Sequence, residues 1–113
     1  KMTQKDFDIV LAGWSADYND ALSYMDLWLT GGGNNHTSYS NPKYDELIKI
    51  GQTSPDQKTR IEAMIQAEKI LGDDMPAGML YFRKQVALVN PRLLDMKFKP
   101  TGSEFYLYDA SVK

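Results

Sequence analysis

The chain has 113 residues, which suits one domain or part of one, and its 42% hydrophobic and 25% charged residues are ordinary for a globular protein. A net charge of −2 provides no basic footprint for nucleic acid, so we expect no nucleic-acid partner. The sequence contains no cysteine, which excludes disulfide frameworks, cysteine zinc sites and thiol nucleophiles.

The first predicted element is a strand over residues 7–12. It is rich in β-forming residues and nearly continuously apolar from Ile9, which is typical of an interior strand buried on both faces. A helix is predicted over residues 21–29 from the helical spacing of its apolar side chains. Gly31 follows that helix and is well placed to adopt the left-handed conformation that ends it.

The turn between this strand and this helix carries two aromatic side chains and several polar ones. Ligands in α/β sheets gather at the carboxyl ends of strands, which makes the turn the leading candidate for a binding site. A structural alternative is open: the aromatics are core residues, and one of the polar residues caps the next helix. The aromatics are Trp14 and Tyr18, and the capping candidates are Asp17, Asn19 and Asp20.

Two longer helices are predicted next. The first begins at Asn41, a capping residue followed by proline in the first turn, and runs to Gly51. The second begins at Ser54, which forms a capping box with Gln57, and runs to about residue 71. Four of its apolar residues fall on one side and predict a core-facing stripe: Ile61, Met64, Ile65 and Leu71.

The last third of the chain predicts short strands. Residues 79–82 form a strand-like run, residues 86–89 form a short apolar run, and residues 96–100 and 104–109 resemble peripheral strand segments. The order of strand, three helices and further strands predicts an α/β or α+β arrangement.

Searches for catalytic and metal-binding patterns give no candidate. His36 is the one histidine and has no second metal-ligating residue near it, and the serine and histidine motifs of hydrolases are absent. The paired Asp73 and Asp74 are expected at a solvated helix end, because neighbouring residues point in different directions. We therefore expect no catalytic residue, metal or cofactor, and a binding protein in place of an enzyme.

Four segments together carry a resemblance to a known family: residues 13–18, residues 41–48, residues 67–71 with 74–76, and residues 80–81 before 88–91. In this order they resemble the C-terminal part of the bacterial extracellular solute-binding proteins of family 5, the oligopeptide- and dipeptide-binding receptors of ABC importers. The resemblance implies an α/β lobe of the periplasmic-binding-protein type II kind, as a C-terminal fragment of a two-lobed protein. Residues 1–82 would belong to the C-terminal lobe, and residues 83–113 would return toward the N-terminal lobe.

The resemblance also implies three ligand-binding residues. Asp17 matches the aspartate that holds the α-ammonium group of a bound peptide, and Trp14 matches an aromatic residue that lines the ligand site. The backbone of Ser15 is expected to pair with the peptide main chain as an added strand does. Leu11 falls where some relatives place an arginine for the peptide's C-terminus, so the resemblance does not extend to that contact.

The expected partners are an oligopeptide ligand and the permease subunits of an ABC importer. The expected location is extracytoplasmic, either in the periplasm or at the cell surface through a lipid anchor in a missing N-terminal region. Three alternatives stay open at this point. They are a receptor of the same family for a nickel chelate or a sugar, a sensor of peptide pheromones, and a small α/β hydrolase using Asp17 with a second carboxylate.

Overall fold

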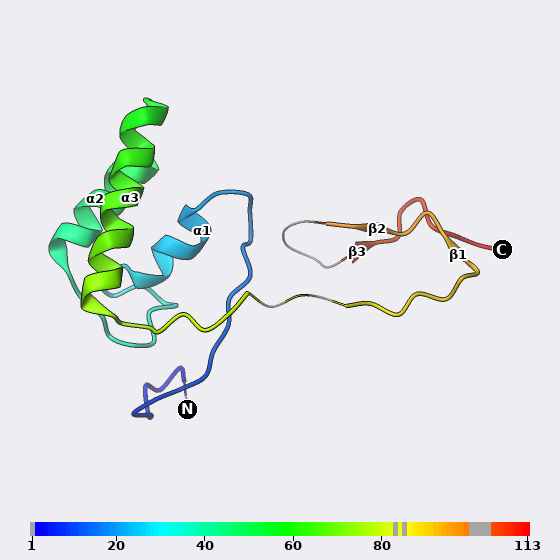
Figure 1. Cartoon of the computed structure of the whole chain (residues 1–113), viewed down its shortest axis with the longest axis horizontal. Helices are drawn as coiled ribbons and strands as arrows, with labels where there is room; N and C mark the ends of the chain where they lie inside the picture. Colours follow the sequence, from blue (N-terminus) through cyan, green and yellow to red (C-terminus); the bar gives the residue numbers. More distant parts are fainter. Residues whose placement is uncertain (1, 83, 85, 100–104) are drawn as a thin grey trace. The chain divides into compact units, whose positions relative to one another are not determined.

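The computed structural model describes residues 2–82, 84, 86–99 and 105–113. The chain divides into two compact units, Lys1–Gly78 and Met79–Lys113. All helices drawn in Figure 1 belong to the first unit, and the short strands belong to the second. Over the described ranges, no helix is both long enough and apolar enough to cross a membrane.

Two helices lying side by side form the body of the first unit. They are α2 (Pro42–Thr53) and α3 (Gln57–Asp74), and the short α1 (Leu22–Met25) packs against both (Figure 1). A single 3₁₀ turn, η1 (Asp26–Trp28), extends α1. The predicted helix over residues 21–29 is therefore present as these two short pieces. The buried core cluster between the three helices comprises Leu22, Tyr44, Ile48, Met64 and Ala67.

The start of α2 is as predicted, and its end lies beyond the predicted one. The Asn41 side chain accepts hydrogen bonds from the backbone N–H groups of Lys43 at 3.0 Å and Tyr44 at 3.3 Å, with Pro42 in the first turn. The helix continues past Gly51, which is buried. A Cβ atom at Gly51 would lie 3.3 Å from Cγ of Met64, so glycine permits close packing here and does not end the helix.

The predicted capping box at the start of α3 is wrong. The capping residue is Asp56, whose carboxylate accepts the backbone N–H of Thr59 at 2.8 Å and its hydroxyl at 2.5 Å. Ser54 instead accepts the N–H of Asp56 at 3.3 Å, within the turn that precedes the helix. A carboxylate is the stronger acceptor at a helix N-terminus because it also interacts favourably with the helix dipole.

The core face of α3 also differs from the predicted stripe. Met64 is buried and Leu71 packs against the core, but Ile61 and Ile65 are 42% and 46% exposed. The positions that α3 buries are Ala63, Met64 and Ala67. Two alanines let the α3 backbone approach α2 closely, which turns the isoleucines outward. The helix ends at Met75 in a left-handed conformation with φ of 47°.

The loop between η1 and α2 is organised by a buried asparagine. The Nδ2 atom of Asn35 donates to the carbonyl oxygens of Leu29 at 3.0 Å and Tyr39 at 2.7 Å, which joins the two ends of the loop. Gly31 has φ of +72°, the predicted left-handed conformation, but it does not end the helix, because η1 ends at Trp28 and its C-cap is Leu29.

The predicted strands over residues 7–12 and 79–82 are absent. Neither segment has a strand partner within the described residues, and their apolar side chains are open to solvent, with Ile9 93% and Phe82 102% exposed. An interior strand needs neighbouring strands for its hydrogen bonds and covering layers for its side chains. The described residues supply neither to these segments. The apolar run over residues 86–89 is likewise not a strand.

The second unit contains two small antiparallel ladders. In one, β1 (Leu93–Leu94) pairs with β4 (Ser111–Val112), and in the other β2 (Lys97–Phe98) pairs with β3 (Phe105–Tyr106). The strands β2 and β3 lie inside the predicted segments 96–100 and 104–109, of which residues 100 and 104 lie outside the described residues. The mixed helix and strand content of the predicted fold is confirmed.

Candidate functional site

Residues 14–17, which contain the predicted ligand-binding residues, are hydrogen-bonded to α1. The indole Nε1 of Trp14 donates to the carbonyl oxygen of Ser23 at 2.8 Å, and the backbone N–H of Asp17 donates to the Ser23 hydroxyl at 2.7 Å. The N–H of Ala16 donates to the Tyr24 hydroxyl at 3.2 Å. Three hydrogen bonds from residues 14–17 therefore end on two consecutive residues of the first helix.

The side chains of this stretch face solvent. Trp14 is 41% exposed and Tyr18 is 46% exposed, so the alternative that both are core aromatics is wrong. Asp17 and Ser15 are exposed as well. Within the described ranges, the Asp17 carboxylate forms no hydrogen bond or ion pair, which leaves both of its oxygens available to a cation. The structure thus brings the three predicted residues together on one anchored loop.

The carboxylate of Asp20, and not that of Asp17, forms the hydrogen bonds at the start of α1. One oxygen of Asp20 accepts the N–H of Leu22 at 2.9 Å, and the other accepts a hydrogen bond from the Arg60 guanidinium. Arg60 also donates through Nε to the carbonyl of Gly51 at 2.8 Å. The Arg60 hydrogen bond, with that of Leu22, lowers the pKa of Asp20 below its usual range. Asp20 thus contacts the first residue of α1 from one position before the N-cap, which is Ala21 and has no side-chain cap, so the predicted capping role is not found as such.

The backbone of residues 13–15 is also free of hydrogen bonds to other described residues. Residues 7–12 also have a backbone without hydrogen bonds to described residues, so unpaired backbone groups alone do not identify Ser15 as a binding residue. Its position between the anchored Trp14 and Asp17 distinguishes Ser15 from that run, because its unpaired backbone lies next to exposed aromatic and acidic residues. Such a backbone is able to pair with an extended chain.

Three residues of the site's support were not identified from the sequence: Ser23, Tyr24 and Arg60. Ser23 is a small polar residue within an apolar helical run, and its burial to 2% exposure needs a hydrogen-bonding role. A small polar residue inside an apolar helical run is therefore a pattern from which Ser23 could have been identified in the sequence. Arg60 lies 40 positions from Asp20, and no local pattern in the sequence indicates their contact.

No metal site is formed within the described part of the chain, where no three His, Asp or Glu side chains gather. Asp74 is exposed, as predicted, but it is not simply solvated. Its carboxylate accepts hydrogen bonds from the Tyr39 hydroxyl at 2.7 Å and the Asn41 side chain at 2.8 Å. The hydrogen bond from Tyr39 lowers the pKa of Asp74 the most, and the one from Asn41 lowers it further. Together the two bonds connect the end of α3 with the start of α2.

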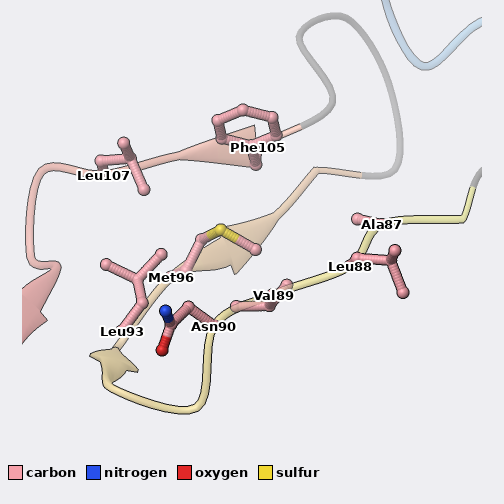
Figure 2. Close-up of a pocket in the computed structure, with 8 residues that line it drawn as sticks. All are labelled: Ala87, Leu88, Val89, Asn90, Leu93, Met96, Phe105 and Leu107. Carbon is pink, nitrogen blue, oxygen red and sulfur yellow. The ribbon is translucent and has the colours of Figure 1, made fainter.

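An apolar cavity of about 230 Å³ lies within the second unit. Figure 2 shows its lining residues, which come from the stretch before β1, from β1 and the turn after it, and from β3 and its continuation. None of the three predicted ligand-binding residues lines it. The lining residues are Ala87, Leu88, Val89, Asn90, Leu93, Met96, Phe105 and Leu107.

Comparison with known proteins relates the chain to peptide-binding proteins. No family model matches it. The oligopeptide-binding protein OppA of Bacillus subtilis is 31% identical over 107 residues, which cover 94% of this chain and 20% of that protein. The dipeptide-binding protein DppE of Bacillus subtilis is 34% identical over 96 residues, which cover 85% of this chain and 18% of that protein.

Solved structures agree with this relationship. The peptide-binding pheromone receptor PrgZ matches with a TM-score of 0.83 and 30% identity, over 99% of this chain and 21% of that chain. The substrate-binding domain of an oligopeptide ABC transporter from Bacillus anthracis matches with a TM-score of 0.77 and 31% identity, over 89% of this chain and 20% of that chain. The chain is homologous to the peptide-binding proteins of ABC transporters. The family resemblance and the fold class predicted from the sequence are thereby confirmed, and the chain spans about a fifth of the length of these homologues.

Proposed function

We propose that this chain is part of an extracellular receptor that binds oligopeptides and delivers them to an ABC importer, with no catalytic step of its own. The observation that carries the proposal is the anchored loop, which presents the unpaired Asp17 carboxylate beside the exposed Trp14 ring. The homology over nearly the whole chain supports it, since the curated relatives reported above are named as peptide-binding proteins.

In this proposal Asp17 binds the α-ammonium group of the peptide. A peptide enclosed between two lobes buries its terminal charge, and a buried charge without a partner is strongly unfavourable. The carboxylate of Asp17 is suited to this role because Asp20, and not Asp17, is engaged by Arg60 and by the start of α1. Removal of water on closure would strengthen the ion pair.

Trp14 and Ser15 supply the part of the site that does not depend on peptide sequence. The Trp14 ring, held by its indole nitrogen, would lie against the bound peptide. The Ser15 backbone would add the peptide as a strand, so that affinity comes from main-chain hydrogen bonds that every peptide offers. This division of roles would allow many different peptides to bind.

The proposal extends to organisation and location. Residues 1–82 would form part of the C-terminal lobe, and residues 83–113 would return toward the N-terminal lobe of a two-lobed protein. The receptor would act outside the cytoplasm, free in a periplasm or held by a lipid anchor, and would contact permease subunits. The likeness to PrgZ favours peptide pheromone sensing as a second candidate function.

The test is peptide binding to the full-length protein that carries this sequence, using one peptide pool with free and with acetylated N-termini. We expect the free amine to be preferred, and Asp17→Asn to remove that preference at a cost of about 2–5 kcal/mol for the free peptides. Asp73→Asn is the matched control, because it neutralises another exposed aspartate on a different element. Equal binding of free and acetylated peptides would refute the proposed role of Asp17, and a nickel chelate or sugar ligand would then be tested.

A further inference from the structure

We propose that Ser23 is a positioning residue that sets the direction of the Asp17 carboxylate and the Trp14 ring before the ligand arrives. This inference rests on the proposed function. Ser23 is 2% exposed, so it cannot contact a peptide itself. It nevertheless contacts both residues of the proposed site, accepting the Asp17 backbone N–H with its hydroxyl and the Trp14 indole N–H with its carbonyl oxygen.

The two contacts act on different degrees of freedom. The hydrogen bond from the Asp17 N–H to the Ser23 hydroxyl, at 2.7 Å, fixes the backbone at Asp17 and so the direction in which its side chain leaves the chain. The bond from the Trp14 indole to the Ser23 carbonyl, at 2.8 Å, fixes the rotation of the ring. One buried residue therefore determines the spacing between an exposed anion and an exposed aromatic face.

This arrangement matters because residues 13–17 have no helix or strand of their own. A loop that is ordered only when the ligand binds lowers affinity, since its ordering opposes binding. Ser23 belongs to α1, which packs against α2 and α3, so the loop takes its rigidity from the helical core. The contact of Ala16 with the Tyr24 hydroxyl, at 3.2 Å, is a third anchor on the same helix.

The two bonds of Ser23 are separable by mutation. Ser23→Ala removes the hydroxyl that receives the Asp17 N–H and leaves the carbonyl that receives the Trp14 indole. Its effect is therefore directed at Asp17. A merely structural role would weaken every peptide alike, whereas a positioning role would weaken the peptides that use the carboxylate more than those that do not.

The experiment measures the dissociation constants of one peptide, with a free and with an acetylated N-terminus, for the full-length protein. The variants are Ser23→Ala, Ser23→Thr, Asp17→Asn and the Ser23→Ala/Asp17→Asn double variant. We expect Ser23→Ala to weaken binding of the free peptide about tenfold and to change the acetylated peptide much less. Ser23→Thr, which keeps the hydroxyl, should restore binding, and Ser23→Ala should have little further effect once Asp17 is neutralised.

A control and a second readout separate positioning from lost stability. Ala63→Gly destabilises α3 at a buried position remote in sequence from the loop, and it should reduce binding of both peptides equally if at all. Hydrogen exchange of the free protein should become faster at the Asp17 amide, whose acceptor is removed in Ser23→Ala, and stay unchanged there in Ala63→Gly.

The outcomes distinguish this inference from the function on which it rests. If the unmodified protein binds no peptide, the proposed function fails, and if it binds peptides without preferring the free amine, the proposed role of Asp17 fails; the role of Ser23 fails with either. If the unmodified protein prefers the free amine and Ser23→Ala keeps that preference in full, only the positioning role is overturned. Unchanged exchange at the Asp17 amide in Ser23→Ala would also overturn it.

Discussion

Tyr44 connects α2 with the end of α1, and removal of its hydroxyl group tests that packing. The side chain is fully buried in α2, and its hydroxyl donates to the carbonyl oxygen of Met25, at the end of α1, at 2.5 Å. Its ring meets the Tyr39 ring edge to face, with centroids 5.8 Å apart. Burial raises the pKa of Tyr44, so the hydroxyl stays protonated and able to donate across the ordinary pH range.

The substitution Tyr44→Phe keeps the ring and its apolar contacts and removes only this donor. The Met25 carbonyl then loses its partner at a partly buried position, which costs about 1–3 kcal/mol in the free energy of unfolding. For a unit of this size, each kcal/mol lowers the melting temperature by roughly 4–8 °C. The measurement is thermal and urea denaturation of the 113-residue chain, followed by far-UV circular dichroism.

Tyr24→Phe is the matched control for this measurement. Tyr24 lies on α1, is 46% exposed, and uses its hydroxyl only toward the exposed Ala16 N–H. We expect its free energy of unfolding to change by less than about 0.5 kcal/mol. The reasoning is refuted if Tyr44→Phe is as stable as the unmodified chain, or if the two variants lose stability equally.

Three further predictions concern other contacts. The pKa of Asp20 is lowered in the folded state, so Asp20 stabilises the fold above its unfolded pKa of about 3.9, and this stability is lost as the pH falls through the lower folded value. Asp20→Asn should therefore cost roughly 1–2 kcal/mol of unfolding free energy at neutral pH. In acid, the urea midpoints of the variant and of the unmodified chain should converge. Gly51→Ala should destabilise the chain by about 1 kcal/mol despite the higher helix propensity of alanine, because the new Cβ would lie 3.3 Å from the Met64 side chain; a rise in the urea midpoint would contradict this. Calorimetric titration of the chain alone should show peptide binding weaker than micromolar, because one wall of a cleft does not exclude water from the Asp17 ion pair.

The elements that could be predicted from the sequence are those fixed by near neighbours. The Asn41 cap depends on residues within one turn and is present as predicted, whereas Gly31 has the predicted left-handed conformation without the predicted capping position. At the start of α3, two acceptors were close enough to cap the same helix, and the sequence pattern favoured Ser54 over Asp56. The core face of α3 was missed because it depends on how closely α2 approaches, which is a tertiary property.

The predicted strands show the same limit more strongly. Residues 7–12 have the composition of an interior strand and residues 79–82 that of a strand, but a strand forms only where other strands complete its hydrogen bonds. Within the ranges that the structure describes, no such partners are present for either segment. Composition therefore indicated the secondary structure that these residues favour, but without strand partners among the described residues they form no strand and most of their side chains are exposed.

The candidate site also has a part that the sequence could indicate and a part that it could not. Trp14, Ser15 and Asp17 are contiguous, so a single motif could indicate them, and their role in binding stays a prediction. The residues that hold the loop in place come from α1 and α3. The contact between Asp20 and Arg60 spans 40 positions, and only the packing of α3 beside α1 reveals it.

The exposed apolar segments also affect how the chain behaves as an isolated species. Residues 9–11 and 79–82 combine free backbone groups with side chains such as Leu11 and Phe82, which are 78% and 102% exposed. Extended apolar segments with unpaired backbones are templates for intermolecular pairing, and such pairing leads to aggregation. Charged residues beside them, Asp8 before the first and Lys84 after the second, act as gatekeepers that oppose this self-association. We therefore expect substitution of these flanking charges to lower the solubility of the chain on its own.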